Sequence, residues 1–157
     1  MCRLAEAEFA ADAATAKAAR DWVAGVLELW DLTEPELTET AALLTSETVT
    51  NAVRHAASAP TVTAAMTDGV VEIGVSDRES GTSPHVSMVD DPLATGGRGL
   101  AIVDALADEW GTAYRNDGKQ VWFRLQTSGW SHATECHCHG DDPSGVELQS
   151  GRRVLVN

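Results

Sequence analysis

Two side chains near the middle of the chain have the chemistry to hold a cation or to move a proton. Glu47 and Asn51 lie four residues apart in the stretch LLTSETVTNAVRHA, residues 43–56. If this stretch is a helix, that spacing stacks them on one face. Carboxylate and carboxamide oxygens are both ligands for hard cations, and a glutamate can also act as a general base. Such pairs are common on solvated helix faces, so this one needs support from elsewhere in the chain.

A third candidate ends a predicted strand. Val71, Ile73 and Val75 alternate with other residues, and the same period of two places Asp77 on their core-facing side. A carboxylate in such a row needs a hydrogen-bond partner. The alternative is that the chain has already left the strand at Asp77, which then caps a turn.

A glycine-rich turn, GGRG at residues 96–99, precedes a predicted helix that begins at about Leu100. Backbone N–H groups at the start of a helix attract anions, and Arg98 adds a guanidinium there. Glycines also simply make turns, so this motif alone is weak. Residues 78–97 have little periodicity and many turn formers, which predicts a long loop between Asp77 and the turn.

Two helices must position the first of these residues. Apolar stripes at helical spacing predict one helix from an N-cap at Asp12 to about Asp31. They predict a second helix that begins with a capping box of Thr33 and Glu36 and ends at about Ala57. The pair Glu47 and Asn51 falls in the second half of this longer helix.

Strands and tight turns account for the remainder of the predicted domain. The predicted strands are residues 3–10, 62–66, 71–77, 109–115 and 119–126. Asp68-Gly69 and Asn116-Asp117-Gly118 stand between successive strands, and both are typical of hairpin turns.

Length and charge limit the classes of function. A chain of 157 residues, 43% of them hydrophobic, suits a single domain with one core. We find no apolar run of membrane-spanning length and no signal-peptide pattern, so we expect a cytoplasmic protein that does not bind membranes. The 11 basic and 24 acidic residues give a net charge of −13, which argues against direct binding of nucleic acid.

The last part of the chain has a different composition. From residue 128 it becomes polar, glycine-rich and irregular, so we predict a domain over residues 1–127 and a disordered tail over residues 128–157. The cysteines, Cys2, Cys136 and Cys138, are odd in number, which argues against a disulfide framework and agrees with a reducing compartment. The Cys-x-Cys spacing is too tight for a structural zinc site, although histidines flank it.

In their order and spacing, these motifs resemble the histidine-kinase-like ATPase superfamily with the Bergerat fold. The closest similarity is to the anti-sigma-factor serine/threonine kinases, in the small single-domain form abundant in actinomycetes. The matching segments are ETVTNAVRHA for the N box, VSDRESG for the first glycine box, and GGRGLAIVDALADEWG for the second. With KAARDWVAGVLELWDL and KQVWFRL, the resemblance covers about residues 9–126. It implies an α/β two-layer sandwich, in which a mixed sheet has helices on one face.

The resemblance also implies roles for the candidate residues. Glu47 would be the general base, Asn51 would coordinate Mg²⁺, and Asp77 would accept a hydrogen bond from the adenine amino group of ATP. Residues 78–97 would form the lid over the nucleotide. The other nucleotide contacts, from the two glycine boxes, would come from Gly81, Gly97, Arg98, Gly99 and Leu100.

The function implied by the resemblance is that of an ATP-dependent regulator. Such a kinase phosphorylates a Ser or Thr of an anti-anti-sigma antagonist and sequesters a sigma factor. The alternative is a nucleotide-gated module that binds a partner without catalysis. It is favoured by Glu79, where the superfamily often has glycine, and by Asp90 and Asp91 in the lid. A phosphorelay component is less favoured, because no helix with a phosphoacceptor histidine precedes the domain. A monomer and a homodimer both stay open.

Overall fold

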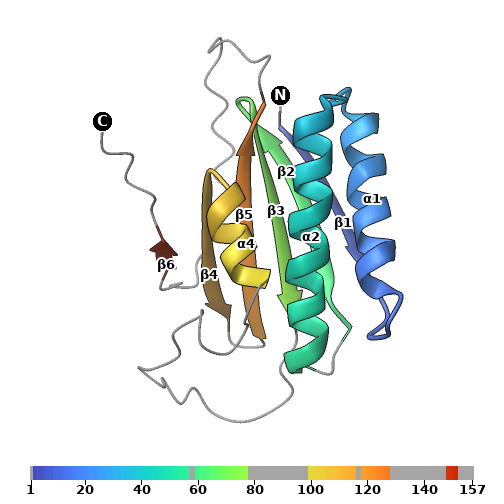
Figure 1. Cartoon of the computed structure of the whole chain (residues 1–157), viewed down its shortest axis with the longest axis vertical. Coiled ribbons are helices and arrows are strands. Elements are labelled where there is room, and N and C mark those ends of the chain that lie inside the picture. Colours follow the sequence, from blue (N-terminus) through green and yellow to red (C-terminus); the bar gives the residue numbers. More distant parts are fainter. Residues whose placement is uncertain (1, 57–58, 78–98, 116–117, 128–147, 152–157) are drawn as a thin grey trace.

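The computed structural model describes residues 2–56, 59–77, 99–115, 118–127 and 148–151. Within these ranges the chain is an α/β two-layer sandwich, with three helices on one face of a six-stranded sheet (Figure 1). This confirms the predicted architecture. The elements in chain order are β1 (Arg3–Glu8), α1 (Thr15–Leu29), α2 (Pro35–Ala56), β2 (Thr61–Thr67), β3 (Val70–Asp77), α4 (Gly99–Leu106), β4 (Glu109–Arg115), β5 (Gly118–Gln126) and β6 (Leu148–Gly151).

All the described strand pairs are antiparallel, in the order β1-β2-β3-β5-β4-β6. The prediction of a mixed sheet is therefore wrong for these strands. The connection that contains α4 does return β4 in the same direction as β3, and these two strands would form a parallel pair if they were neighbours. They are not neighbours, because β5 lies between them and pairs with both.

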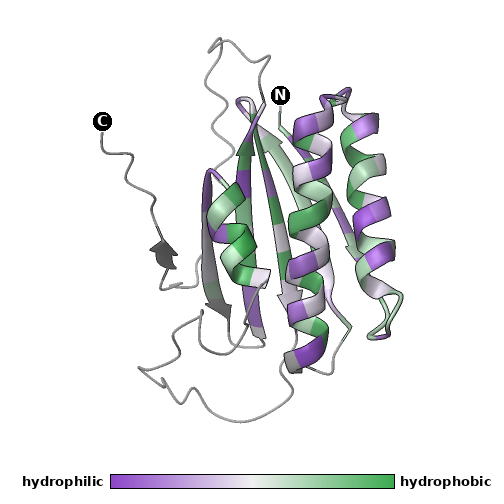
Figure 2. Ribbon diagram, viewed as in Figure 1, coloured by the Kyte–Doolittle hydropathy of each residue, from purple (hydrophilic) through white to green (hydrophobic). Residues whose placement is uncertain are grey.

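The core lies between the sheet and the helices. Alternate residues of β3 and β5, such as Val71, Ile73 and Phe123, are fully buried on the helix side of the sheet. Val23 of α1 and Leu44 of α2 are equally buried against them. Figure 2 shows both helices as bands of purple and green, the pattern of amphipathic helices with one face turned to a core.

The first helix begins later than the sequence predicts. α1 begins at Thr15, and Asp12 lies in the turn before it. Oδ1 of Asp12 accepts hydrogen bonds from the backbone N–H of Ala14 (2.7 Å) and from the hydroxyl of Thr15 (3.2 Å). Asp12 therefore fixes the turn into the helix instead of occupying the N-cap position, because its short side chain reaches the backbone two residues on.

The second helix also begins after its predicted cap. α2 begins at Pro35, a residue that suits the first helical position because its missing N–H would have no partner there. The carbonyl of Glu34 accepts the first helical bond, from the N–H of Thr38 at 3.0 Å. Glu34 is thus the N-cap residue, and Thr33 lies one position too early to form the predicted capping box.

The structure confirms the hairpin turn that the sequence predicts between β2 and β3. Asp68 has a φ of 50° and Gly69 a φ of 78°, which are the left-handed conformations of a type I′ hairpin turn. The carbonyl of Gly69 accepts bonds from the N–H (2.8 Å) and hydroxyl (3.0 Å) of Thr127, so the turn also holds the end of β5.

The predicted tail is described only over residues 148–151. These residues form β6, which pairs with β4, and the prediction of disorder for the other residues from 128 onwards lies outside the described residues. Cys2 takes part in a disulfide bond, which goes against the argument from the odd cysteine count, because an odd count leaves one cysteine over but does not prevent two from pairing. Among the described helices, none combines the length and apolar character needed to cross a bilayer.

Candidate functional site

Helix α2 carries Glu47 and Asn51, as predicted, on one continuous face. Both side chains are half-buried. The helix is buried at Leu44, Thr45, Thr48 and Val49, so the two candidate residues border the face that packs on the core. The buried threonines are satisfied within the helix, because each hydroxyl donates to the carbonyl four residues earlier at 2.7 Å.

The start of α4 rests directly on Glu47. A Cβ placed on Gly99 would lie 3.3 Å from Oε2 of Glu47 and 3.4 Å from its carbonyl oxygen. This approach is tighter than ordinary van der Waals contact, and only glycine allows it without displacing the carboxylate. Two motifs that are 52 positions apart in the sequence, the helix carboxylate and the glycine-rich turn, therefore meet in the structure.

Asp77 is the last residue of β3, on the face of the sheet that carries Val71, Ile73 and Val75. The strand pairs it with Lys119 of β5, and its Oδ1 accepts a hydrogen bond from the backbone N–H of Lys119 at 3.2 Å. The prediction that Asp77 continues the core-facing row is confirmed. The alternative, that it follows the strand and caps a turn, is excluded by this pairing.

These residues come from elements that pack together. α2 lies against both β3 and α4. Figure 1 shows the end of β3, the second half of α2 and the start of α4 towards the same end of the molecule. A strand that ends in a carboxylate, the half of a helix that carries a carboxylate and an amide, and the first turn of another helix thus lie towards one end of the molecule.

The chemistry of this region fits a magnesium nucleotide. The N–H groups in the first turn of α4 have no partners within the helix, and they can bind phosphate oxygens. Asn51 offers an amide oxygen, a ligand that suits Mg²⁺ when phosphates and water supply the other ligands. The described residues contain no cluster of three or more His, Cys, Asp or Glu side chains that could hold a metal by itself. A metal at Asn51 would therefore depend on the nucleotide.

Of the other residues predicted to contact the nucleotide, the structure describes only Gly99 and Leu100. Leu100 is buried, with 4% of its surface exposed, so its side chain belongs to the packing of α4 and only its backbone N–H is placed to meet a ligand. Gly81, Gly97 and Arg98 lie outside the described residues, as does the predicted lid. The sequence analysis missed Lys119 as the partner of Asp77, because that contact depends on the register between β3 and β5.

Comparison with known proteins identifies the domain. A search of curated proteins found no match to the chain. The family model described as the histidine kinase-like ATPase domain matches residues 9–125, which is most of the chain and contains every buried core residue described above. The matched region includes α2, the end of β3 and α4, which carry the candidate residues that the structure describes. The chain therefore belongs to the family of histidine kinase-like ATPase domains, which implies that it binds ATP.

Proposed function

We propose that this protein is a serine/threonine kinase of the anti-sigma-factor type. It would bind Mg-ATP, phosphorylate a Ser or Thr of an anti-anti-sigma antagonist, and sequester a sigma factor. The observation that supports catalysis is the contact between Gly99 and Glu47. It brings a carboxylate to the start of the helix that is placed to bind phosphates, which is where an attacking hydroxyl must approach.

In this proposal each residue has a separate task. Glu47 accepts the proton of the substrate hydroxyl as that oxygen bonds to the γ-phosphorus, and the bond to the β-phosphate oxygen breaks to release ADP. Asn51 supplies a ligand to Mg²⁺, which neutralises phosphate charge when it is bound. Asp77 accepts a hydrogen bond from the adenine amino group, and the first N–H groups of α4 bind the phosphates.

A second candidate is a nucleotide-gated module that binds its partner without catalysis. It is supported by the carboxylates of Glu79, Asp90 and Asp91 in the segment after Asp77. Negative charge there repels phosphates and does nothing to hold the γ-phosphate for transfer. In this case Glu47 would contribute to the packing of α4 and not to proton transfer.

The test is a transfer assay with labelled ATP and candidate antagonist proteins, with partner binding measured in parallel. Glu47→Gln keeps the shape of the side chain and should retain ATP binding, but should lower transfer by on the order of 10²–10⁴-fold. Asn51→Ala should weaken Mg-ATP binding as well as transfer. Glu39→Gln is the matched control, because Glu39 is an exposed glutamate on the same helix and should change neither quantity.

The outcomes separate the two candidates. If the wild-type protein transfers no phosphate but ATP still alters partner affinity, the binding module is correct and the kinase is not. If transfer occurs and Glu47→Gln transfers as fast as the wild type, the protein is a kinase but Glu47 is not its base.

A further inference from the structure

Four large apolar side chains are exposed in the part of the chain that the structure describes. They are Leu4, Leu29, Leu43 and Leu106, which are 77%, 81%, 41% and 47% exposed. Leu29 ends α1, and Leu4 lies on β1, opposite Ala65 on the face of the sheet away from the helices. Leu43 and Leu106 lie on α2 and α4. Two of the four exposed leucines therefore belong to the helices that carry the candidate site.

Leu43 shares its side of α2 with the proposed base. It precedes Glu47 by four residues, which is one helical turn, so the two side chains are neighbours on one face, about 6 Å apart along the helix axis. Leu44, the next residue, is fully buried in the core. The exposure of Leu43 therefore comes from its place on the outer side of α2 and not from an end of the helix.

Leu106 lies on the side of α4 that is turned to α2. It follows Gly99 by seven residues, which is two helical turns, and Gly99 is the residue that meets Glu47. Ile102, between them on the same side, is half-buried. Figure 1 shows that α4 runs antiparallel to α2, against which it packs. Leu43 and Leu106 therefore both lie from the contact of Gly99 with Glu47 towards the start of α2.

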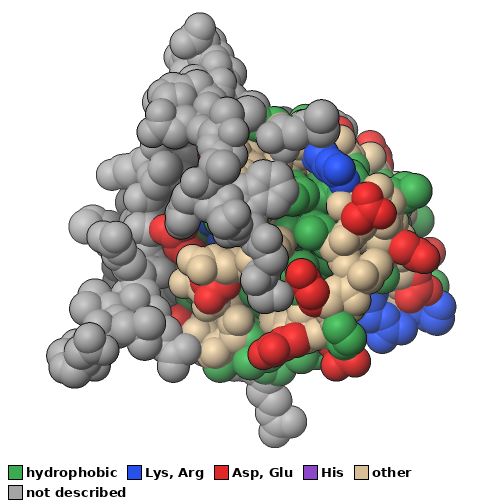
Figure 3. Space-filling view, turned by 90° about the horizontal axis from the view of Figure 1, so that it is seen from above, with side chains coloured by type: hydrophobic (Ala, Val, Ile, Leu, Met, Phe, Trp, Pro, Cys, Tyr) green, Lys and Arg blue, Asp and Glu red, His purple; other side chains and the backbone are tan. Residues whose placement is uncertain are grey.

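We call Leu43, Ile102 and Leu106 the apolar strip, and the charged residues of its two helices are mostly acidic. Four Asp or Glu side chains stand on α2 and α4, and Arg54, in the last turn of α2, is their single Lys or Arg. Figure 3 views the end of the molecule where α2 begins, and Asp and Glu side chains are spread across the surface there with few Lys or Arg among them. A partner that covers the strip should therefore carry apolar side chains with Lys or Arg around them.

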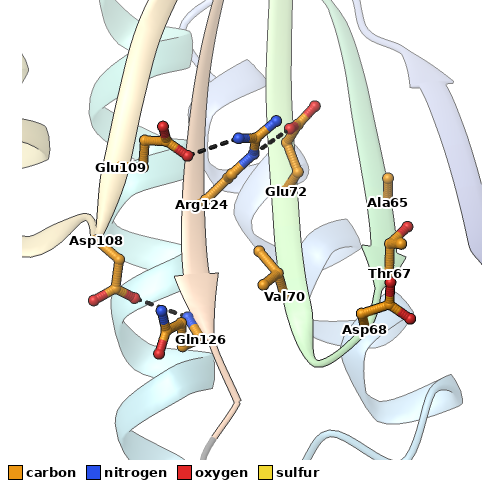
Figure 4. A pocket seen from close by; sticks show the side chains of 9 residues that line it. All are labelled: Ala65, Thr67, Asp68, Val70, Glu72, Asp108, Glu109, Arg124 and Gln126. Carbon is orange, nitrogen blue, oxygen red and sulfur yellow. Dashed lines mark hydrogen bonds and ion pairs between the residues drawn. The ribbon is translucent and has the colours of Figure 1, made fainter. Parts of the chain in front are cut away.

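The uncovered face of the sheet suits such a partner less well. Its open hollow of about 660 Å³ is lined mainly by polar and charged side chains (Figure 4). Arg124 in the hollow donates to Glu72 at 2.7 Å and to Glu109 at 2.6 Å, so charged groups there already pair with one another. This face is also on the far side of the sheet from α2 and α4, so a protein bound to it cannot bring a hydroxyl to Glu47.

We propose that the antagonist protein docks on the apolar strip, through apolar side chains flanked by Lys or Arg, and so brings its Ser or Thr to Glu47. The inference rests on the proposed kinase function, because it is the acceptor hydroxyl that must reach this carboxylate. The strip begins one helical turn from Glu47, so a protein held there keeps its hydroxyl close to the phosphates. A contact centred on two exposed leucines is small, which suits a substrate that must leave after transfer.

Polar substitutions in the apolar strip of the full chain test the proposal. Leu43→Gln and Leu106→Gln keep residues that favour a helix but remove the apolar contact. In an assay with labelled ATP and the antagonist, each should raise KM for the antagonist about 5- to 30-fold, the effect of losing a well-packed interface side chain. The kcat and the Kd for ATP should not change. Leu43→Met keeps an apolar side chain and should have the KM of the wild type.

Leu29→Gln and Leu4→Gln are the matched controls. α1, which carries Leu29, lies on the other side of α2 from α4, and Leu4 lies on the opposite face of the sheet (Figure 1). Both leucines are more exposed than those of the strip, so neither control should change KM. The proposal is wrong if the controls raise KM as much as the strip variants do. It is also wrong if the strip variants leave KM unchanged while the wild type transfers phosphate.

Direct binding of the antagonist, measured by calorimetry, separates this proposal from the proposed function. If the wild type binds an antagonist but transfers no phosphate to it, the kinase function is wrong, and the Kd values of the same variants decide whether the strip is the docking surface. The complex should also weaken in 1 M salt, where the Debye length falls to about 3 Å, because basic residues flank the contact.

Three binding results would overturn the docking proposal. The first is a wild-type protein that binds no antagonist. The second is an affinity for the antagonist that does not fall in high salt. The third is a set of strip variants that weaken binding of a sigma factor and leave the antagonist unaffected, because the strip would then be the surface for the sigma factor.

Discussion

Asp77 shows how a single residue joins the fold to the proposed chemistry. Its carboxylate lies at the end of a core-facing row and accepts the N–H of Lys119 at 3.2 Å. A carboxylate has two oxygens and several lone pairs, so a bond to the backbone leaves it able to accept from a ligand as well. The same side chain can therefore secure the strand pairing and select an adenine.

The variant Asp77→Asn should lower affinity for ATP and leave the fold intact. The amide oxygen of asparagine can still accept from Lys119, but its NH₂ group opposes the adenine amine. Loss of a hydrogen bond to a charged group costs about 1.5–3 kcal/mol, which is roughly 10- to 150-fold in Kd. Isothermal titration calorimetry with ATP measures the change.

Asp108→Asn is the matched control for this variant. Asp108 also accepts a backbone N–H in the sheet, from Gln126 at 2.8 Å, but at the other end of the strands. ATP affinity should be unchanged in this control. If Asp77→Asn binds ATP as tightly as the wild type does, Asp77 has only the structural role of accepting the N–H of Lys119, and adenine binds elsewhere.

For single residues, the sequence predicts on which face of a helix or strand a side chain lies better than it predicts the hydrogen-bond partner of that side chain. Alternation in β3 was enough to place Asp77 on the core-facing side, and a spacing of four was enough to stack Glu47 and Asn51. The bond between Asp77 and Lys119 depends on the register of strands that are far apart in the sequence. No local pattern encodes that register, so it appears only in the three-dimensional structure.

Among the helices and strands, α4 is the one whose position depends most on a single contact. The helix is eight residues long, and Gly99, its first residue, lies against Glu47. Short helices contribute little stability of their own, so packing on α2 and the core must hold α4 in place. The position of its N–H groups, and with it phosphate binding, therefore depends on how closely Gly99 can approach α2.

We expect Gly99→Ala to fold but to impair the site. The new methyl group would meet the carboxylate of Glu47 at 3.3 Å and push aside either that side chain or the start of α4. Phosphoryl transfer should fall by roughly 10-fold or more, because small misplacements of positioned groups are costly. A transfer assay, or an ATP titration if no transfer occurs, measures the loss.

Gly25→Ala provides the comparison, because Gly25 lies in α1 and a Cβ there has nothing within 4 Å. It should stabilise the protein by about 0.5–1 kcal/mol, the usual gain when alanine replaces glycine inside a helix, and leave ATP affinity unchanged. If Gly99→Ala behaves in the same way, the contact with Glu47 has no functional consequence.

Element topology was harder to predict than element type. The hairpin of Asp68 and Gly69 follows from local chemistry, since both residues tolerate a positive φ. The strand order does not, because the position of β5 between β3 and β4 is decided by which pairing buries Phe123 and Leu125 against the helices. The mistaken prediction of a mixed sheet arose from this step, as did the failure to anticipate β6.

For the whole molecule, one core accounts for the fold. All the residues of the main buried cluster lie between Ala19 and Leu125. The family match covers almost the same part of the chain, residues 9–125. β6 adds a short ladder at the edge of the sheet next to β4, and it follows the cluster in the sequence. The core and the nucleotide site should therefore form without the residues that come after β5.

Deletion of residues 129–157 should accordingly leave a cooperatively folding protein that binds ATP as the full chain does. The deletion removes β6, which pairs with β4, and it also removes Cys136 and Cys138, the other cysteines of the chain. Both proteins are therefore compared in reduced form, because Cys2 takes part in a disulfide bond. A loss on the order of 1 kcal/mol would lower Tm by roughly 2–8 °C in a domain of this size. Differential scanning calorimetry and an ATP titration would measure both properties. A truncated protein without a cooperative transition would show that the edge ladder of β6 is part of the core structure, and that the domain extends beyond Thr127.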